Sequence, residues 1–330
     1  MTIHALGEFR GKQALWVQAK PQVLKHLLNV AMIESVESSS RMEQIEVGPK
    51  TLDRLLLKAE PPAAEDRSQA ELAGYRDALG LIHRNALDMP FSENVVRQLH
   101  RELLKFTPAG GGDYKIAPND IVEKDHRGKI VKMRLRTVEP VLVQPYMEAL
   151  HRRFSEALDA GEISPLVLIP LYVHDFLCIH PFRDGNGRIA RLLTVLLLHK
   201  QGYDVGRYIS IERVIEETKS TYYESLALAD VDWFAGRHNH APFTEYILGV
   251  VLAAFRELER NTEVDLSHGA KKLMVQQAIA SLPTKFRLSD LEAKCPLLKK
   301  DAISTALKGL KKDGKVTSSG RGPAARWHRT

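Results

Sequence analysis

Residues 180–191 constrain the fold more than any other segment, and they read His-Pro-Phe-Arg-Asp-Gly-Asn-Gly-Arg-Ile-Ala-Arg. The residues before them, from Ser164-Pro165 to Leu177, are almost all apolar, which predicts a helix buried on all sides. The residues after them are apolar at every third or fourth position from Ile189, which predicts a one-sided helix over 186–202. A loop with two glycines therefore connects a buried helix to the N-terminus of an amphipathic one.

This loop predicts a binding site for phosphate groups. Gly185 and Gly187 let the backbone fold tightly, and the N–H groups at the start of the next helix attract anions. Arg188 and Arg191 are three positions apart on that helix, so both can reach one polyphosphate. We expect the loop and the two guanidinium groups to surround the same ligand.

Two further side chains of the segment have chemistry that suits phosphoryl groups. Asp184 is a hard oxygen ligand of the kind that holds a phosphate-bound Mg²⁺. His180 is close enough in sequence to take a proton from an attacking hydroxyl group. A single Gly-x-Gly, a lone histidine or two solvated arginines would each be ordinary, but their combination within one short segment favours a phosphate site.

The segment resembles the signature of the Fic family, His-x-Phe-x-Asp/Glu-Gly-Asn-Gly-Arg-x-x-Arg, and fills every defining position. The resemblance extends over most of residues 20–260. It implies a mainly α, helical Fic fold that transfers AMP from Mg-ATP to a Ser, Thr or Tyr hydroxyl of a target protein or of itself. The related Doc kinases carry Lys where this chain has Gly187, so Gly187 favours nucleotidyl transfer.

The resemblance also implies a role for each residue of the motif. His180 would be the general base and Asp184 the metal ligand. Arg188 would offset developing charge, and Arg191 would position the γ-phosphate. Phe182 would pack into the core and hold the loop. The cradle around the phosphates would consist of Gly185, Asn186 and Gly187.

Three residues downstream fall where the family binds adenine. Tyr222 and Tyr223 match the place of its adenine pocket, although adjacent tyrosines are also common where a helix meets the core. Asp230 occupies a position that is often Asn in relatives. The adenine role is therefore an implication of the resemblance alone.

A strand-like alternation over 129–138, after a turn at 125–128, predicts a lone β-hairpin among helices. It matches the place of the family's flap, whose strand pairs with the target segment by β-augmentation. The alternative, a plain surface hairpin, stays open. The candidate docking residues are Lys132, Met133, Arg134 and Leu135.

Residues 39–44 resemble the inhibitory pattern of one large class of Fic proteins, Ser/Thr-x-x-x-Glu-Gly/Asn. Ser39 and Glu43 fill its first two defined positions and share a helix face. The resemblance implies that Glu43 pairs with Arg191 and removes that arginine from the γ-phosphate. Gln44 departs from the pattern, which leaves the helix end open. A solvated, serine-rich helix end is the alternative.

Composition excludes several other classes. No apolar run is long enough to span a membrane, and the first residues contain no signal-peptide core, so we expect a cytoplasmic protein. Cys178 and Cys295 have no metal-ligand spacing, which predicts reduced thiols, with Cys178 in the core. His238 and His240 are expected in a solvated loop, because no nearby carboxylate or Cys in the sequence completes a metal site.

Basic residues are concentrated at the C-terminal end. From Lys271 onward fourteen cations stand against four acids, a net charge of +10, so the first 270 residues carry −4 of the total of +6. Three helical patterns and two short strands follow a polar linker at 261–269, the order of a winged helix-turn-helix. Its expected recognition helix is 300–311 and its wing 318–326. Such a domain binds either DNA or protein.

Other helices are expected at 22–37, 51–58, 68–87, 92–106, 144–158, 216–229 and 243–260. The expected domains are N-terminal helices with the inhibitory segment (1–110), a Fic core with flap and catalytic loop (111–262) and a small α+β winged helix (270–330). An alternative function is a DNA-binding regulator whose Fic site senses nucleotide or removes AMP from a target. A homo-oligomer stays open.

Overall fold

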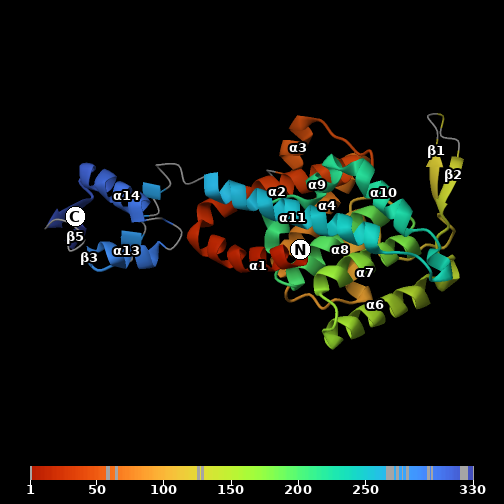
Figure 1. The fold of residues 1–330 in the computed structure, drawn as a ribbon. Helices are drawn as coiled ribbons and strands as arrows, with labels where there is room; N and C mark the ends of the chain where they lie inside the picture. The colour runs from red at the N-terminus through yellow and green to blue at the C-terminus, as the bar shows by residue number, and fades with distance from the viewer. Residues whose placement is uncertain are drawn as a thin grey trace. The chain divides into compact units, whose positions relative to one another are not determined.

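The computed structural model describes residues 2–56, 60–63, 66–124, 127, 130–264, 271–272, 275–276, 278–279, 282–295, 298, 300–319 and 326–329. Their contacts divide the chain into two compact units, one of residues 1–10 and 26–256, the other of residues 11–25 and 257–330 (Figure 1). The prediction of a mainly helical fold with small sheets is confirmed. None of the described helices combines the length and apolarity needed to cross a membrane.

Five helices precede the hairpin: α1 (Thr2–Ala19), α2 (Pro21–Met42), α3 (Pro49–Leu56), α4 (Arg67–Asn85) and α5 (Glu93–Leu104). α1 was not expected from the sequence. α2 is longer than the pattern at 22–37 suggested, and it includes the serines at 38–40. Asp66 caps α4, because its Oδ1 accepts a hydrogen bond of 3.0 Å from Gln69 N.

Six helices follow: α6 (Val143–Ala160), α7 (Pro165–Ile179), α8 (Asn186–Lys200), α9 (Ile211–Glu217), α10 (Lys219–Ala229) and α11 (Ala241–Val264). Short 3₁₀ turns lie at η1 (Pro140–Leu142), η2 (Asp204–Arg207) and η3 (Trp233–Ala235). The single helix expected at 216–229 is wrong, because Thr218 leaves the helical region (ψ 31°) between α9 and α10. Residues 261–264 of the expected linker belong to α11, and 265–269 lie outside the described residues.

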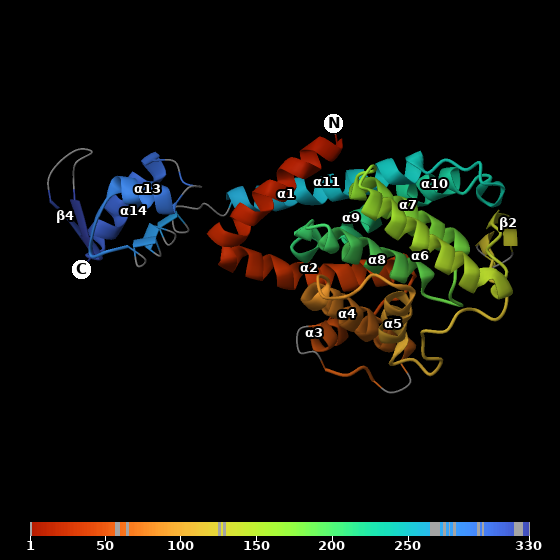
Figure 2. The same ribbon diagram turned by 90° about the horizontal axis from the view of Figure 1, so that it is seen from below.

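α7 and α8 form the centre of the first unit. α7 contacts α6 and α8, and α8 contacts α4 and α5 (Figure 2). The prediction that α7 is buried on all sides is confirmed, since none of its residues is exposed. Pro165 occupies its first turn, although the side chain of Ser164 makes no capping hydrogen bond.

The prediction of a one-sided α8 is wrong. Its polar residues are buried together with its apolar ones. Three of these buried side chains have a partner on another helix: Arg188 pairs with Glu71, Arg191 with Ser39, and His199 with His83. The other two bond locally, Asn186 to the backbone of Phe182 and Thr194 to the carbonyl of Ala190. Burial of polar groups is tolerated where hydrogen bonds replace those to water. Hydrogen bonds to other helices therefore take the place of the contacts with water that the sequence pattern predicts for the polar face of α8.

The expected hairpin consists of β1 (Ile121–Lys124) and β2 (Ile130–Leu135), paired antiparallel with Ile121 opposite Leu135. Of the turn expected at 125–128, only residue 127 is described.

The second unit contains α13 (Leu288–Lys294), α14 (Lys300–Lys312), β3 (Lys285–Arg287), β4 (Val316–Ser319) and β5 (Arg326–Arg329). The strands form an antiparallel sheet in the order β3-β5-β4, and β3 was not expected. The helices and sheet enclose a common apolar cluster that includes Phe286, Leu291, Leu307 and Val316. The helix expected at 271–282 and the wing at 318–326 lie partly outside the described residues.

Candidate active site

His180 ends α7 in a left-handed conformation (φ 53°, ψ 59°), which is uncommon for residues other than glycine. Its Nδ1 lies 3.1 Å from the carbonyl oxygen of Leu177. Because a carbonyl only accepts, Nδ1 carries the proton and Nε2 keeps a lone pair. Burial, with a smaller contribution from the charges of Lys115 and Arg134, lowers the pKa of His180 to about 4, although the hydrogen bond to Leu177 acts to raise it. The imidazole is therefore neutral at pH 7 and has the tautomer of a base.

The loop after His180 is closed by hydrogen bonds of one side chain. Asn186 Oδ1 accepts from the N–H of Phe182 at 2.9 Å, and Asn186 Nδ2 donates to the carbonyl of Phe182 at 2.7 Å. The Phe182 ring is fully buried and stacks on His100 with ring centroids 3.8 Å apart. Gly185 has φ 79°, and a Cβ there would lie 3.1 Å from a methyl of Leu103. Only glycine suits this sharp entry into α8.

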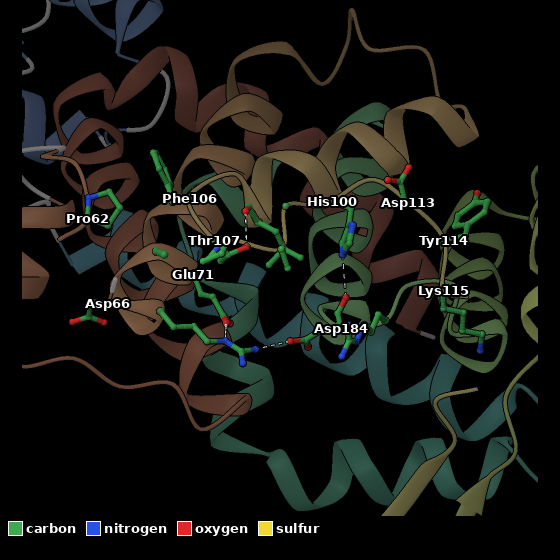
Figure 3. A pocket seen from close by; sticks show the side chains of 18 of the residues that line it. Pro62, Asp66, Glu71, His100, Phe106, Thr107, Asp113, Tyr114, Lys115 and Asp184 are labelled. Atoms are coloured by element: carbon green, nitrogen blue, oxygen red, sulfur yellow. Dashed lines mark hydrogen bonds and ion pairs between the residues drawn. The ribbon is translucent and has the colours of Figure 1, made fainter. Parts of the chain in front are cut away.

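His100 holds the same loop from α5, and sequence reasoning did not identify it. Its Nδ1 accepts from the N–H of Gly112 at 2.7 Å, so Nε2–H donates to the backbone carbonyl of Asp184 at 3.0 Å (Figure 3). Burial lowers the pKa of His100 to about 4. A histidine inside a helical pattern carries no sequence signal for this role.

Arg188 is only 2% exposed and forms an ion pair with Glu71, which is equally buried. The alternative of a solvated arginine is thus wrong. Glu71 also accepts from Arg67 Nε at 2.5 Å, and Arg67 extends to Asp184 Oδ2 at 2.8 Å. The Asp184 side chain is 52% exposed and lies 3.5 Å from Arg188. Two carboxylates and two guanidinium groups therefore alternate along this side of the loop, and Glu71 was not identified from the sequence.

Arg191, the last residue of the motif, is held by α2. Its Nε donates to Ser39 Oγ at 2.9 Å, and one terminal nitrogen donates to Glu43 Oε1 at 2.8 Å. Burial alone would lower the pKa of Arg191, but the neighbouring Glu43 raises the pKa above its ordinary value. The serines at 38–40 are buried, so the alternative of a solvated helix end is wrong.

The end of α2 fixes the place of Glu43. Ile45 N donates to the carbonyl of Ser40 and Gln44 N donates to that of Arg41, the two hydrogen bonds of a Schellman motif. Gln44 has φ 61°, a left-handed conformation that glycine and asparagine adopt at lower cost. This explains why the family pattern prefers those two residues at the position after the glutamate.

Lys115 is a further buried residue that sequence reasoning missed. Its ammonium donates to Asn119 Oδ1 at 2.7 Å, to Thr137 Oγ1 at 2.8 Å and to the carbonyl of Ile179 at 3.4 Å. Its backbone N–H donates to the carbonyl of Pro181 at 2.8 Å. Burial lowers the pKa of Lys115 to about 8. The residue therefore holds the backbone on both sides of His180.

The two tyrosines of α10 differ in environment. Tyr222 is buried and contacts Tyr223 and Tyr246 with ring centroids 5.2 and 5.7 Å apart, whereas Tyr223 is 36% exposed. Burial raises the pKa of Tyr222, and its charged neighbours include Arg191 and Glu43. Tyr222 thus lies on the Arg191 side of the motif.

The candidate docking residues of β2 point to different sides. Met133 is exposed, as are Ile130 and Val131, whereas Leu135 is buried. Arg134 is largely buried and its Nε lies 3.1 Å from Asp230 Oδ2 at the end of α10. For Lys132 only the backbone position in β2 is described. Arg134 therefore joins the hairpin to the helical core.

A cavity of about 1380 Å³ borders the loop on the side of Asp184. Figure 3 shows His100, Glu71, Tyr114 and Lys115 around it. His180 and Arg191 are not among its lining residues.

His238 and His240 do not lie in a solvated loop, so that prediction is wrong. Their side chains are 17% and 22% exposed, and Asp175 of α7 lies within 4 Å of both. Asp175, the carboxylate beside the two histidines, comes more than sixty residues earlier in the chain. The spacing of residues around His238 and His240 therefore did not reveal it. Cys178 and Cys295 are free thiols and Cys178 is buried, as predicted, and Cys295 is buried as well.

Comparison with known proteins identifies the family of the motif. The Fic/DOC family model matches residues 90–198. A Fido domain-containing protein of Dictyostelium discoideum is 29% identical over 122 residues, which are 37% of this chain and 78% of that protein. Protein adenylyltransferase Fic of Drosophila willistoni is 32% identical over 155 residues, 44% of this chain but 28% of that protein. A crystal structure of a Fic domain-containing signaling protein from Bacteroides thetaiotaomicron has TM-score 0.66 at 25% identity and covers 78% of this chain and 97% of that one.

Proposed function

Because this chain carries a domain of the Fic/DOC family, we propose that it transfers AMP from Mg-ATP to a Ser, Thr or Tyr hydroxyl of a target protein or of itself. The observation that carries the proposal is the geometry of His180, whose Nδ1 is bonded to the carbonyl of Leu177 so that Nε2 can accept a proton, and burial lowers its pKa. The loop after it leads directly into the N-terminus of α8.

In the proposed reaction His180 Nε2 takes the proton of the target hydroxyl as its oxygen attacks the α-phosphorus. A bond forms between that oxygen and the α-phosphorus, the bond to the bridging α–β oxygen breaks, and pyrophosphate leaves. The N–H groups of the first turn of α8, at Asn186 and Gly187, lack partners within the helix and suit the developing charge. Tyr222 and Tyr223 would border the adenine.

Asp184 fits the proposed metal. Its half-exposed carboxylate is a hard ligand beside the phosphate cradle. Mg²⁺ would neutralise phosphate charge when bound there. Arg67 Nη2 already contacts Asp184 Oδ2, so we expect this arginine to move when the carboxylate becomes a ligand.

We also infer that the enzyme inhibits itself through Glu43. An arginine whose charge is paired with Glu43 and whose Nε and one terminal nitrogen are bonded to Ser39 and Glu43 has less charge and fewer N–H groups for the γ-phosphate. A Cβ on Gly187 would lie 2.7 Å from Glu43 Oε1, so the carboxylate lies against the proposed phosphate cradle as well. Glu43 would thus oppose two contacts of ATP, that of the γ-phosphate with Arg191 and that of the phosphates with the cradle at Gly187.

The hairpin is the proposed docking strand for the target. β1 and β2 form a two-stranded sheet, which supports addition of a further strand, and β2 exposes Ile130, Val131 and Met133. Main-chain hydrogen bonds would then place the target segment, while Arg134 holds the hairpin to Asp230.

The test of the proposed reaction uses ATP labelled on the α- or on the γ-phosphate. AMP transfer leaves label on protein only with the α-labelled nucleotide. Protein label from the γ position would instead establish kinase chemistry and overturn the proposal. Loss of label from a previously modified target, without new incorporation, would favour AMP removal.

The pH dependence of kcat/KM tests the state of His180. Its folded-state pKa of about 4 lies below the ordinary value of 6.5, so the base form persists as the pH falls to about 4. We expect the rate at pH 5.5 to stay within about twofold of that at pH 7, whereas an unshifted histidine would lose about tenfold. A decline centred near pH 6.5 would contradict a buried, neutral His180.

A second candidate function belongs to the second unit, whose proposed winged helix begins at 270. The exposed lysines of α14, among them Lys308 and Lys312, support binding to a phosphate backbone. We expect the full chain to shift duplex DNA in a gel. Each of these lysine-to-alanine changes should reduce the slope of the logarithm of affinity against the logarithm of salt concentration by about one. Lys50→Ala, at an exposed lysine of α3, is the control. No shift at low salt would leave a protein-binding module.

A further inference from the structure

Histidines and carboxylates from separate parts of the chain meet beside α7, away from the phosphate loop. Asp175 lies on α7, and His238 and His240 lie between η3 and the start of α11. His238 Nε2 is 2.7 Å from His240 Nε2, and these nitrogens are 3.9 and 3.8 Å from Asp175 Oδ1. Three donor atoms of the kinds that bind transition metals therefore face one point.

We propose that Asp175, His238 and His240 bind a divalent transition ion of the Zn²⁺ class. Bonds of about 2.0–2.1 Å in a tetrahedral shell place ligand atoms about 3.3 Å apart. The pair at 2.7 Å would open and the pairs near 3.8 Å would close by about half an ångström. Two imidazoles and one carboxylate make a three-ligand site with a position left for water or another ligand.

The hydrogen bonds behind the site set His240 in the tautomer that a ligand needs. His240 Nδ1 lies 3.0 Å from His174 Nδ1, and His174 Nε2 lies 3.2 Å from Asp230 Oδ1. The carboxylate only accepts, so His174 Nε2 carries a proton and His174 Nδ1 accepts from His240 Nδ1–H. His240 Nε2 then has its lone pair directed toward Asp175 and His238. Metal-bound imidazoles usually donate their other ring N–H to a carboxylate, a carbonyl or water, and here His174, itself bonded to Asp230, takes that place.

Charge and burial agree with this assignment. Burial is the main cause that lowers the pKa of His240 to about 4; Asp175 acts to raise this pKa, and His174 and His238 act to lower it. A neutral imidazole is the form that binds metal. Two further described groups lie beside these residues: the Trp233 indole donates to Asp175 Oδ1 at 2.7 Å, and the buried Cys178 thiol lies 3.6 Å from His174 Nε2 and 3.5 Å from Asp230 Oδ1.

The ion would add a further link between α7 and the segment before α11, which are already joined by the contacts of Trp233 with Asp175 and of His240 with His174. Asp175 is five residues before His180 on α7, and the histidines precede α11. The same outer support continues from Asp230 to Arg134 of the hairpin. Metal binding would therefore stabilise the first unit near both the catalytic helix and the hairpin.

The test is a calorimetric titration of the tag-free full chain with ZnCl₂, and a titration with CoCl₂ followed by Trp233 fluorescence. We expect one ion per chain with a dissociation constant of about 1 µM or tighter, and no competition from millimolar Mg²⁺. His240→Ala and Asp175→Asn should each weaken binding by at least about 100-fold, and His174→Ala by about 10–100-fold. Trp233→Phe should keep the stoichiometry and lose the fluorescence change.

His4→Ala, which removes an exposed histidine of α1, is the matched control and should bind Zn²⁺ as the parent chain does. Circular dichroism and thermal unfolding without metal establish that each variant is folded. Unchanged Zn²⁺ affinity in both His240→Ala and Asp175→Asn, or equal affinity for Mg²⁺ and Zn²⁺, would overturn the proposal. The Asp175→Asn variant keeps the shape of the site, so its loss of binding would not reflect a packing defect.

Discussion

His180→Ala lowers the incorporation of label from α-labelled ATP into protein by about 10²–10⁴-fold, the usual contribution of a general base. His100 of α5 also contacts the loop, but it cannot replace His180 as the base. Its Nδ1 already accepts from the N–H of Gly112, and its Nε2–H donates to the carbonyl of Asp184. The measurement is the initial rate of label transfer at saturating nucleotide.

His180→Asn is the more informative variant. Asparagine tolerates the left-handed backbone of this position, and its amide can donate to the carbonyl of Leu177 as Nδ1 does. It keeps the loop but supplies no base. We expect unchanged nucleotide binding together with the same loss of rate. Near-normal transfer by His180→Asn would remove His180 from the reaction, and loss of nucleotide binding would give it a structural role instead.

What the sequence predicted correctly lies close together along the chain. The loop at 180–191, the burial of α7, the hairpin and most helix positions follow from local periodicity and from glycine placement. The elements that were missed carry weak local signals. α1 has apolar residues such as Leu6 and Trp16 without a regular period, and β3 is only three residues long.

Partners from distant segments account for the other differences. Glu71, His100 and Lys115 are ordinary polar residues of helices or loops until folding brings them to the motif. The sequence pattern of α8 indicates a solvated polar face, yet α2 and α4 supply carboxylates and hydroxyls that cover that face. Hydrophobic periodicity cannot report such pairing, because it treats every charged residue as exposed.

Glu43→Gly raises self-modification with ATP by about 10–100-fold. A charge-assisted hydrogen bond of about 1.5–3 kcal/mol favours the state in which Arg191 is held by α2, and each 1.36 kcal/mol corresponds to about tenfold. The change also clears the space beside Gly187, where Glu43 Oε1 would lie 2.7 Å from a Cβ. The measurement is label from α-labelled ATP in the chain itself, compared at equal protein concentration.

Glu46→Gly is the matched control, since it removes an exposed carboxylate three residues along the same segment and should leave the rate unchanged. Glu43→Gln keeps the size of the side chain but not its charge, so an intermediate increase would separate electrostatic from steric inhibition. Equal labelling by Glu43→Gly and the parent chain would contradict an inhibitory Glu43.

The same variant has a consequence that does not depend on activity. Arg191 is 3% exposed, and without Glu43 its charge loses its carboxylate partner and keeps the hydrogen bonds to Ser39. An unpaired buried charge is destabilising, so Glu43→Gly should unfold at a lower temperature than the parent chain when nucleotide is absent. A γ-phosphate would restore an anion at Arg191. ATP should therefore raise the unfolding temperature of Glu43→Gly more than that of the parent, and ADP, which lacks this phosphate, should do so less. If ATP and ADP stabilise the variant equally, then Arg191 is not the residue that receives the γ-phosphate.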